Sequence, residues 1–133
     1  MKLKKCSMEK IPSLGPYSSY VIVENFLFIS GQIAIDPTTK KLISETIEIE
    51  TERVMKNLQI ILSETGIGFE NVIKTSLFIK NINDYPKINF IYSKFFQKEN
   101  YPARETIQVF GLPKNANIEI SLIAHTKKNK NLT

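Results

Sequence analysis

Apolar and polar residues alternate in short runs near the start of the chain and then switch to a helical period. Two short apolar runs, Tyr20–Val23 and Phe26–Ile29, are separated by the polar pair Glu24-Asn25, which is typical of a β-hairpin. From 46 to 65 the apolar residues instead recur at spacings of three and four, with glutamates early in the segment and Gly66 after it. We therefore predict two strands and then a helix, which has glutamates at its positive end and Gly66 as its C-terminal stop.

The second half of the chain predicts a further strand, a second helix and two last strands. Residues 73–80 alternate between apolar and mixed positions, which is typical of a strand with one buried face. The expected buried face consists of Ile73, Thr75, Leu77 and Ile79. A helix is expected to begin near Asp84, with Pro86 in its first turn. Two strands follow, at 106–110 and 118–125.

The second helix carries an apolar stripe with helical spacing. The stripe consists of Ile88, Ile91, Tyr92, Phe95 and Phe96. An aromatic row at this spacing is typical of a helix face that packs on a core, and it seldom marks a cofactor site. We therefore assign these side chains to the core.

The order of the elements is strand, strand, helix, strand, helix, strand, strand, with room for an extra edge strand near residues 2–6. This order predicts an α+β fold in which a mixed sheet carries both helices on one face. The opposite face is then bare, and it carries apolar side chains such as Phe78 and Ile123. An exposed apolar sheet face is typical of a subunit contact, so we expect an oligomer.

Length and composition fit one domain without a membrane segment. The chain has 133 residues, of which 42% are hydrophobic, and this suffices for one core. Its apolar runs are far shorter than the roughly 20 residues of a membrane helix, and no apolar secretory segment follows the basic N-terminus. Cys6 is the only cysteine, so an internal disulfide is excluded and a reducing compartment fits best. We predict one cytoplasmic domain over residues 1–133, with a core at about 10–126 and flexible basic ends.

The net charge of +5 invites a comparison with nucleic-acid-binding proteins. Seven of the 18 basic residues lie within residues 1–10 and 126–133, together with only one of the 13 acidic residues. The body between these ends is therefore nearly neutral. Binding to phosphates requires several cations gathered on one face, so the charge pattern does not favour nucleic acid as the primary partner.

Counting reactive residues excludes several classes of catalyst. His125 is the only histidine, so two-histidine RNA cleavage and a zinc site built on histidines lack their parts. The glycine-rich motifs of nucleotide cofactors and the nucleophile elbow of serine hydrolases do not occur. We interpret His125, at a strand end, as structural and Cys6 as incidental. The sequence therefore offers neither a metal site nor a nucleotide site.

Two ionisable residues lie where the sheet should be buried. Arg104 opens a predicted strand, and Glu119 projects from the next one, on the side opposite to Ile118 and Ile120. Adjacent antiparallel strands would bring the two groups to one edge. They could form a cross-strand ion pair, or Arg104 could hold a small carboxylate while Glu119 activates a water molecule. The composition does not choose between these interpretations.

Six short motifs in order resemble the signatures of one family. They are Gly15-Pro16-Tyr17-Ser18, Ser30-Gly31-Gln32-Ile33, Asn89 with the following Tyr92–Phe96, Pro102-Ala103-Arg104, Leu112-Pro113-Lys114, and Ile118-Glu119-Ile120. Each motif is weak alone, but together they run from about residue 10 to 125 and resemble the Rid family, also called YjgF/YER057c. The Pro-Ala-Arg motif resembles its RidA branch in particular.

This resemblance implies a chorismate-mutase-like subunit in a homotrimer, with active sites in clefts between neighbouring subunits. It also implies an enamine/imine deaminase, a hydrolase acting on C=N bonds without a cofactor. Similar proteins convert 2-aminoacrylate, or its tautomer 2-iminopropionate, to pyruvate and ammonia. The two alternatives are a non-catalytic ligand-binding or chaperone-like trimer and an endoribonuclease or translation inhibitor.

The resemblance also implies roles for individual residues. Arg104 would hold the substrate carboxylate with the backbone N–H of Gly31, and Glu119 would direct the attacking water. Tyr17 and Ser30 would line the pocket. Two further residues have open roles: Asn89 would either contact the substrate or tie helix to strand, and Thr106 could donate a hydrogen bond into the cleft.

Four positions differ from the family pattern. They are Ser19, Lys40, Thr106 and Ser121. Lys40 replaces a usual glycine, which suggests a different turn after Pro37. Because Arg104 and Glu119 are retained, these differences affect the expected substrate range more than the expected reaction.

Overall fold

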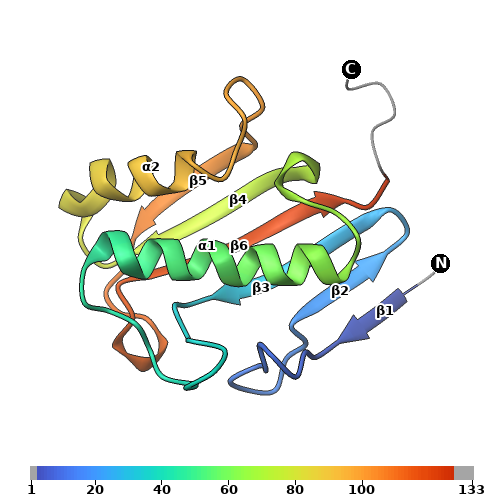
Figure 1. Cartoon of the computed structure of the whole chain (residues 1–133), viewed down its shortest axis with the longest axis horizontal. Coiled ribbons are helices and arrows are strands. Elements are labelled where there is room, and N and C mark those ends of the chain that lie inside the picture. The colour runs from blue at the N-terminus through green and yellow to red at the C-terminus, as the bar shows by residue number, and fades with distance from the viewer. Residues whose placement is uncertain (1–2, 128–133) are drawn as a thin grey trace.

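The computed structural model describes residues 3–127, which form one mixed sheet with two α-helices on one of its faces (Figure 1). The strands are β1 (Leu3–Cys6), β2 (Tyr20–Val23), β3 (Phe26–Gln32), β4 (Val72–Ile79), β5 (Ala103–Gln108) and β6 (Ile118–His125), and the helices are α1 (Ile47–Glu64) and α2 (Tyr85–Ser93). The order across the sheet is β1-β2-β3-β6-β4-β5. This architecture confirms the predicted fold class, including the extra edge strand β1.

Pairing in the sheet is antiparallel except at one edge. β4 pairs with β6 in the antiparallel sense and with β5 in the parallel sense. β5 is therefore an edge strand that lies beside β4 and not beside β6. Two of the basic residues near the N-terminus, Lys4 and Lys5, lie in β1, whereas Lys2, Lys128 and Lys130 lie outside the described residues.

The ends of α1 follow the signals in the sequence. The Thr46 hydroxyl accepts the backbone N–H of Ile49 at 3.1 Å and caps the first turn. At the other end, Gly66 has a φ of 80°, and the backbone N–H of Ile67 donates to the carbonyl of Leu62 at 3.1 Å. This is the left-handed stop predicted for Gly66, because glycine adopts positive φ without a steric penalty. The predicted hairpin of β2 and β3 is also confirmed.

Three predicted details differ from the structure. Ile73 is exposed, because a bulge between Val72 and Lys74 opposite β6 turns it away from the core. The strand expected at 106–110 is β5, at Ala103–Gln108, since pairing with β4 fixes its ends. Phe110 therefore lies beyond the strand and is fully exposed.

The apolar stripe expected on the second helix does pack on the core. α2 ends at Ser93, so Phe95 and Phe96 follow the helix and do not belong to it. Phe96 is nevertheless buried, and both rings pack edge-on against Phe69, with centroids 5.5 Å and 5.2 Å away. The assignment of these side chains to the core was correct.

The face of the sheet away from the helices is partly apolar. Phe26, Phe28 and Ile107 on this face are each exposed by 40% or more. No helix among the described residues is long and apolar enough to cross a membrane. That a second subunit covers this face remains a prediction.

Glu50 is a fully buried carboxylate that joins α1 to the turn before β6. Its Oε2 accepts the backbone N–H of Asn117 at 2.7 Å, and its Oε1 accepts the Nδ2 of the same residue at 2.8 Å. A buried carboxylate is tolerated where both oxygens have donors. The pair therefore fixes how α1 lies over the end of β6.

Replacing Glu50 by glutamine is expected to lower the free energy of unfolding by about 2 kcal/mol, because the new amide nitrogen faces a donor of Asn117. Urea unfolding followed by circular dichroism at fixed protein concentration measures this loss. The matched control is Glu52→Gln on the exposed side of α1, where the ion pair with Lys56 spans 3.3 Å. This control is expected to change stability by less than about 0.5 kcal/mol, and equal losses in both variants would contradict the assignment.

Candidate functional site

Arg104 lies on β5 and faces the helices. It pairs with Thr75 of β4, which is buried on the helix side of the sheet. Its Nη2 donates to Oδ1 of Asn89 at 2.7 Å and to the hydroxyl of Tyr85 at 3.0 Å. The guanidinium carbon also lies 4.9 Å from the ring centroid of Tyr92. α2 therefore holds the guanidinium in place at the edge of the sheet.

The geometry of α2 explains this arrangement. Tyr85 and Asn89 are four residues apart, so both side chains lie on the same face of the helix and reach the same guanidinium. We call Tyr85, Asn89 and Arg104 the arginine cluster. A cavity of about 230 Å³ opens beside it, lined by Asn89, Tyr92, Ser93, Tyr101, Pro102 and Arg104.

Glu119 lies on β6 and faces away from the helices. It pairs with Phe78 of β4, on the bare face of the sheet. Its carboxyl group covers Gly31: a Cβ atom on Gly31 would lie 2.7 Å from Cδ of Glu119. Only glycine permits this close approach. Burial raises the pKa of the Glu119 carboxyl above its ordinary value.

The prediction that Arg104 and Glu119 meet at one edge is wrong within a single protomer. β4 separates their strands, because β5 pairs in parallel with β4 and not with β6. Their partners on β4 are Thr75 and Phe78, an odd number of positions apart, and successive side chains of a strand alternate between faces. The two groups therefore lie on opposite faces. This placement also excludes, within one protomer, the ion pair considered as an alternative.

Tyr17 and Ser30 lie on the side of Glu119. Tyr17 and Gly31 line a small cavity of about 60 Å³, and the Tyr17 hydroxyl accepts the backbone N–H of Leu14 at 3.2 Å. The Ser30 hydroxyl donates to the carbonyl of Ser18 at 2.6 Å, so it serves the backbone in this structure. We call Tyr17, Gly31 and Glu119 the glutamate cluster.

Asn89 and Thr106 lie on the side of Arg104. Asn89 ties α2 to β5 through the guanidinium, as one of the two roles considered for it requires. Thr106 pairs with Leu77 of β4, and its Oγ1 is buried without a hydrogen-bond partner among the described residues. An unpartnered buried hydroxyl costs free energy. Thr106 therefore has a donor that no described residue of this protomer uses.

Two of the positions that differ from the family pattern have structural contacts. The buried Ser19 hydroxyl donates to the carbonyl of Ile11 at 3.2 Å and accepts the backbone N–H of Met8 at 3.3 Å. Lys40 has a φ of 62°, a conformation that glycine adopts without strain. Its Nζ donates to the carbonyl of Lys10 at 3.1 Å. Both residues therefore hold the segment before β2. Ser121 of β6, another position that differs from the family pattern, lies opposite Ser76 of β4.

Sequence reasoning missed Tyr85 as a contact of Arg104. The sequence did carry a signal, since Tyr85 precedes Asn89 by one helical turn in the predicted helix. His125 was interpreted as structural, and its ring does pack edge-on against Phe26 with centroids 5.5 Å apart. Its Nδ1 accepts the backbone N–H of Lys127 at 3.3 Å.

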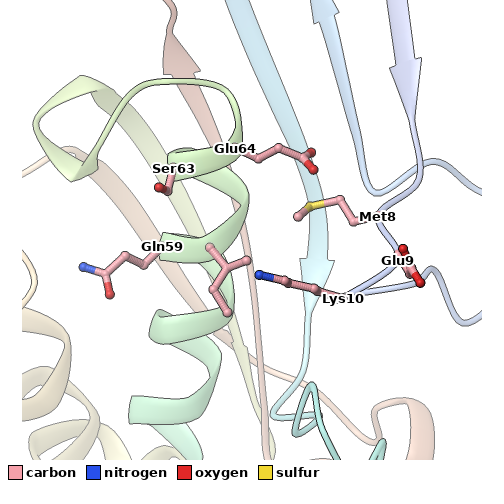
Figure 2. Close-up of a pocket in the computed structure, with 7 residues that line it drawn as sticks. Met8, Glu9, Lys10, Gln59, Ser63 and Glu64 are labelled. Carbon is pink, nitrogen blue, oxygen red and sulfur yellow. The ribbon is translucent and has the colours of Figure 1, made fainter.

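A larger cavity lies elsewhere, between α1 and the segment before β2 (Figure 2). It measures about 680 Å³ and is lined by Met8, Glu9, Lys10, Gln59, Ile60, Ser63 and Glu64. Figure 2 shows the Lys10 side chain extending toward α1. The Glu64 carboxylate already accepts the Tyr20 hydroxyl at 2.9 Å. None of the predicted site residues lines this cavity, so the arginine and glutamate clusters remain the candidate site.

Comparison with known proteins identifies the family. Residues 8–126 match the model of the family described as Endoribonuclease L-PSP. A solved structure of a conserved Rid family protein, YyfA of Yersinia pestis, superposes with a TM-score of 0.88 at 36% identity and covers 93% of this chain and 99% of its own. The chain therefore belongs to the Rid (YjgF/YER057c) family, and its fold is the chorismate-mutase-like fold of this family.

The relatives carry several different names. The chain is 49% identical over 115 residues to a putative regulator, AldR, of Lactococcus lactis, covering 86% of this chain and 90% of the relative. It is 42% identical over 119 residues to the human 2-iminobutanoate/2-iminopropanoate deaminase, covering 89% and 86%. A putative endoribonuclease of Thermotoga maritima superposes with a TM-score of 0.89 at 41% identity, covering 97% and 100%.

The burial of Glu119 predicts how stability depends on pH. Because its pKa is raised in the folded protein, the folded state holds the proton more tightly than the unfolded state, and the stability that this proton gives is lost as pH rises from the unfolded pKa through the folded pKa. Glu119→Gln cannot ionise. At about pH 7.5 its free energy of unfolding in urea is expected to exceed that of wild type. At about pH 4 the two free energies are expected to lack this difference. The same difference at both pH values would contradict the assignment.

Proposed function

We propose that this protein is an imine/enamine deaminase, which hydrolyses 2-aminoacrylate, 2-iminopropionate and similar imines to a 2-keto acid and ammonia. Its relatives named 2-iminobutanoate/2-iminopropanoate deaminase and Reactive Intermediate Deaminase A, each 42% identical, support this class. The observation that carries the proposal is the fixed guanidinium of Arg104 beside a cavity of about 230 Å³. A positioned guanidinium is suited to bind a small carboxylate.

The complete site requires two copies of the chain, because Arg104 and Glu119 lie on opposite faces of the sheet in one protomer. We propose that Arg104 of one protomer and Glu119 of a neighbour form each site, in a homotrimer with three such sites. The exposed Phe26, Phe28 and Ile107 support burial of the bare face in this assembly.

In the proposed reaction, water adds to the C=N carbon of the imine. Glu119 takes a proton from this water as the C–O bond forms and passes it to the imine nitrogen, which gives a carbinolamine. Glu119 then takes the proton of the new hydroxyl and passes it to the amino nitrogen, so that the C–N bond breaks, the C=O bond forms and ammonia leaves. The raised pKa of its carboxyl group suits both transfers. Arg104 and the backbone N–H of Gly31 hold the carboxylate, Tyr17 and Ser30 line the pocket, and Thr106 supplies a donor. This chemistry uses no cofactor or metal.

The expected setting is the cytoplasm, where pyridoxal-phosphate-dependent dehydratases acting on serine and threonine release such imines. The imine also hydrolyses in water unaided. Positioning of the carboxylate and of the attacking water is therefore sufficient to explain catalysis.

A coupled assay tests the reaction. A serine/threonine dehydratase and serine supply the imine, and pyruvate release is followed with and without this protein. Wild type is expected to accelerate release over the dehydratase alone, and Arg104→Ala to lose at least about tenfold in kcat/KM, since a charge-assisted contact contributes about 1.5–3 kcal/mol.

The matched control is Arg53→Ala, which removes the other arginine of the chain, on α1. It is expected to keep the activity. Full activity in Arg104→Ala would refute the carboxylate clamp, and no acceleration by wild type would refute the deaminase. Cleavage of RNA that disappears in Glu119→Gln would favour an endoribonuclease instead.

Mixing two inactive variants tests the shared site. Arg104→Ala and Glu119→Gln are denatured together in equal amounts and refolded, and their activity is compared with that of each variant refolded alone. In the mixture, half of the protomers retain Arg104 and the other half retain Glu119. A site formed between two protomers therefore has both groups in about a quarter of cases, and about a quarter of wild-type activity should return. If each site lay within one protomer, the mixture would recover none.

A further inference from the structure

Tyr85 is the first residue of α2, and it lies directly beside the guanidinium of Arg104. The guanidinium carbon is 5.4 Å from the centroid of its ring, and Nη2 donates to its hydroxyl at 3.0 Å. The side chain is 39% exposed. Tyr85 can therefore reach a molecule that approaches Arg104 from outside the protomer.

The hydrogen bonds of Arg104 determine what a bound carboxylate meets. A terminal guanidinium nitrogen carries two hydrogens, and those of Nη2 are used by Asn89 and Tyr85. A carboxylate forms a bidentate contact with a guanidinium, in which the two donors are either Nη1 and Nη2 or Nε and Nη2. Both edges include Nη2. A carboxylate that docks on Arg104 therefore needs another donor in the place of Nη2.

The Tyr85 hydroxyl meets this need. It accepts the hydrogen of Nη2 with a lone pair and keeps its own hydrogen to donate. Each hydrogen of Nη2 is next to either Nη1 or Nε, so the hydroxyl lies beside one of these remaining donors. We infer that the Tyr85 hydroxyl is the second donor to the substrate carboxylate, one oxygen of which binds Arg104 while the other binds Tyr85.

Asn89 positions the guanidinium of Arg104, and it also acts on the Tyr85 hydroxyl. Hydrogen bonds from Asn89 and Arg104, together with the positive charge of Arg104, lower the pKa of the Tyr85 phenol. A more acidic phenol donates a stronger hydrogen bond to an anion while it keeps its proton. The arginine cluster therefore works as a unit in which each member orients the next.

This inference rests on the proposed function, because it names a further contact of the same carboxylate. The test measures binding of pyruvate, and of the uncharged pyruvamide, to wild type and Tyr85→Phe by calorimetry. We expect the Kd of Tyr85→Phe for pyruvate to be about tenfold higher than that of wild type. Its Kd for pyruvamide should equal that of wild type. In the coupled assay, KM should rise while kcat changes little, since the contact is equal in substrate and transition state.

The matched control is Tyr20→Phe, which also removes one tyrosine hydroxyl but a distant one, bonded to Glu64. It is expected to leave Kd and KM unchanged. Unchanged or tighter pyruvate binding in Tyr85→Phe would overturn the inference, since the hydroxyl would then only compete for Nη2. Equal weakening for pyruvamide would also overturn it, because the role would then be structural.

The two proposals fail in different ways. If wild type neither binds pyruvate nor accelerates the coupled assay, the proposed function fails and the inference fails with it. If wild type is active and Arg104→Ala is not, while Tyr85→Phe behaves as wild type, only the inference on Tyr85 fails.

Discussion

The position of β4 between β5 and β6 is the constraint on which the rest of the site depends. β4 pairs in parallel with one neighbour and antiparallel with the other, so its register fixes the face and the height of both Arg104 and Glu119. The alternation of side chains along a strand then places the two groups on opposite surfaces of one layer. No rotamer change can bring them together, because the sheet itself separates them.

Each cluster is built from a close contact that its sequence permits. On one side, the absence of a side chain at Gly31 lets the Glu119 carboxyl lie against the backbone of β3. On the other side, the helical spacing of Tyr85 and Asn89 presents two oxygen atoms to one nitrogen of Arg104. The first contact shields a half-buried carboxyl group from part of the solvent, and the second fixes a cation that is also half-buried. The arginine cluster and the glutamate cluster therefore offer different chemistry, a fixed cation and a carboxyl group with a raised pKa.

Much of the fold could be predicted from local patterns. Gly66 marked the C-terminal end of α1, and the apolar stripe of α2 indicated its buried face, because caps and helical spacing are local properties. The partner of β5 could not be predicted, since nothing near Arg104 says which strand it pairs with. The bulge that exposes Ile73 and the contact of Tyr85 with Arg104 also depend on pairing across the sheet and packing against it. The motifs indicated candidate residues, and the structure places these residues in two separate groups.

The sheet separates the arginine cluster from the glutamate cluster, and this separation affects how the substrate range of the proposed site can change. In the proposed assembly, the gap between the anion anchor and the group that directs water is spanned by contacts between subunits. Substitutions at Phe28 or Ile107, which contribute no reactive group, would shift one protomer against the next and so widen or narrow that gap. Substitutions in the contacts between subunits would then change the size of substrate that the site accepts, while the residues that perform the chemistry stay the same.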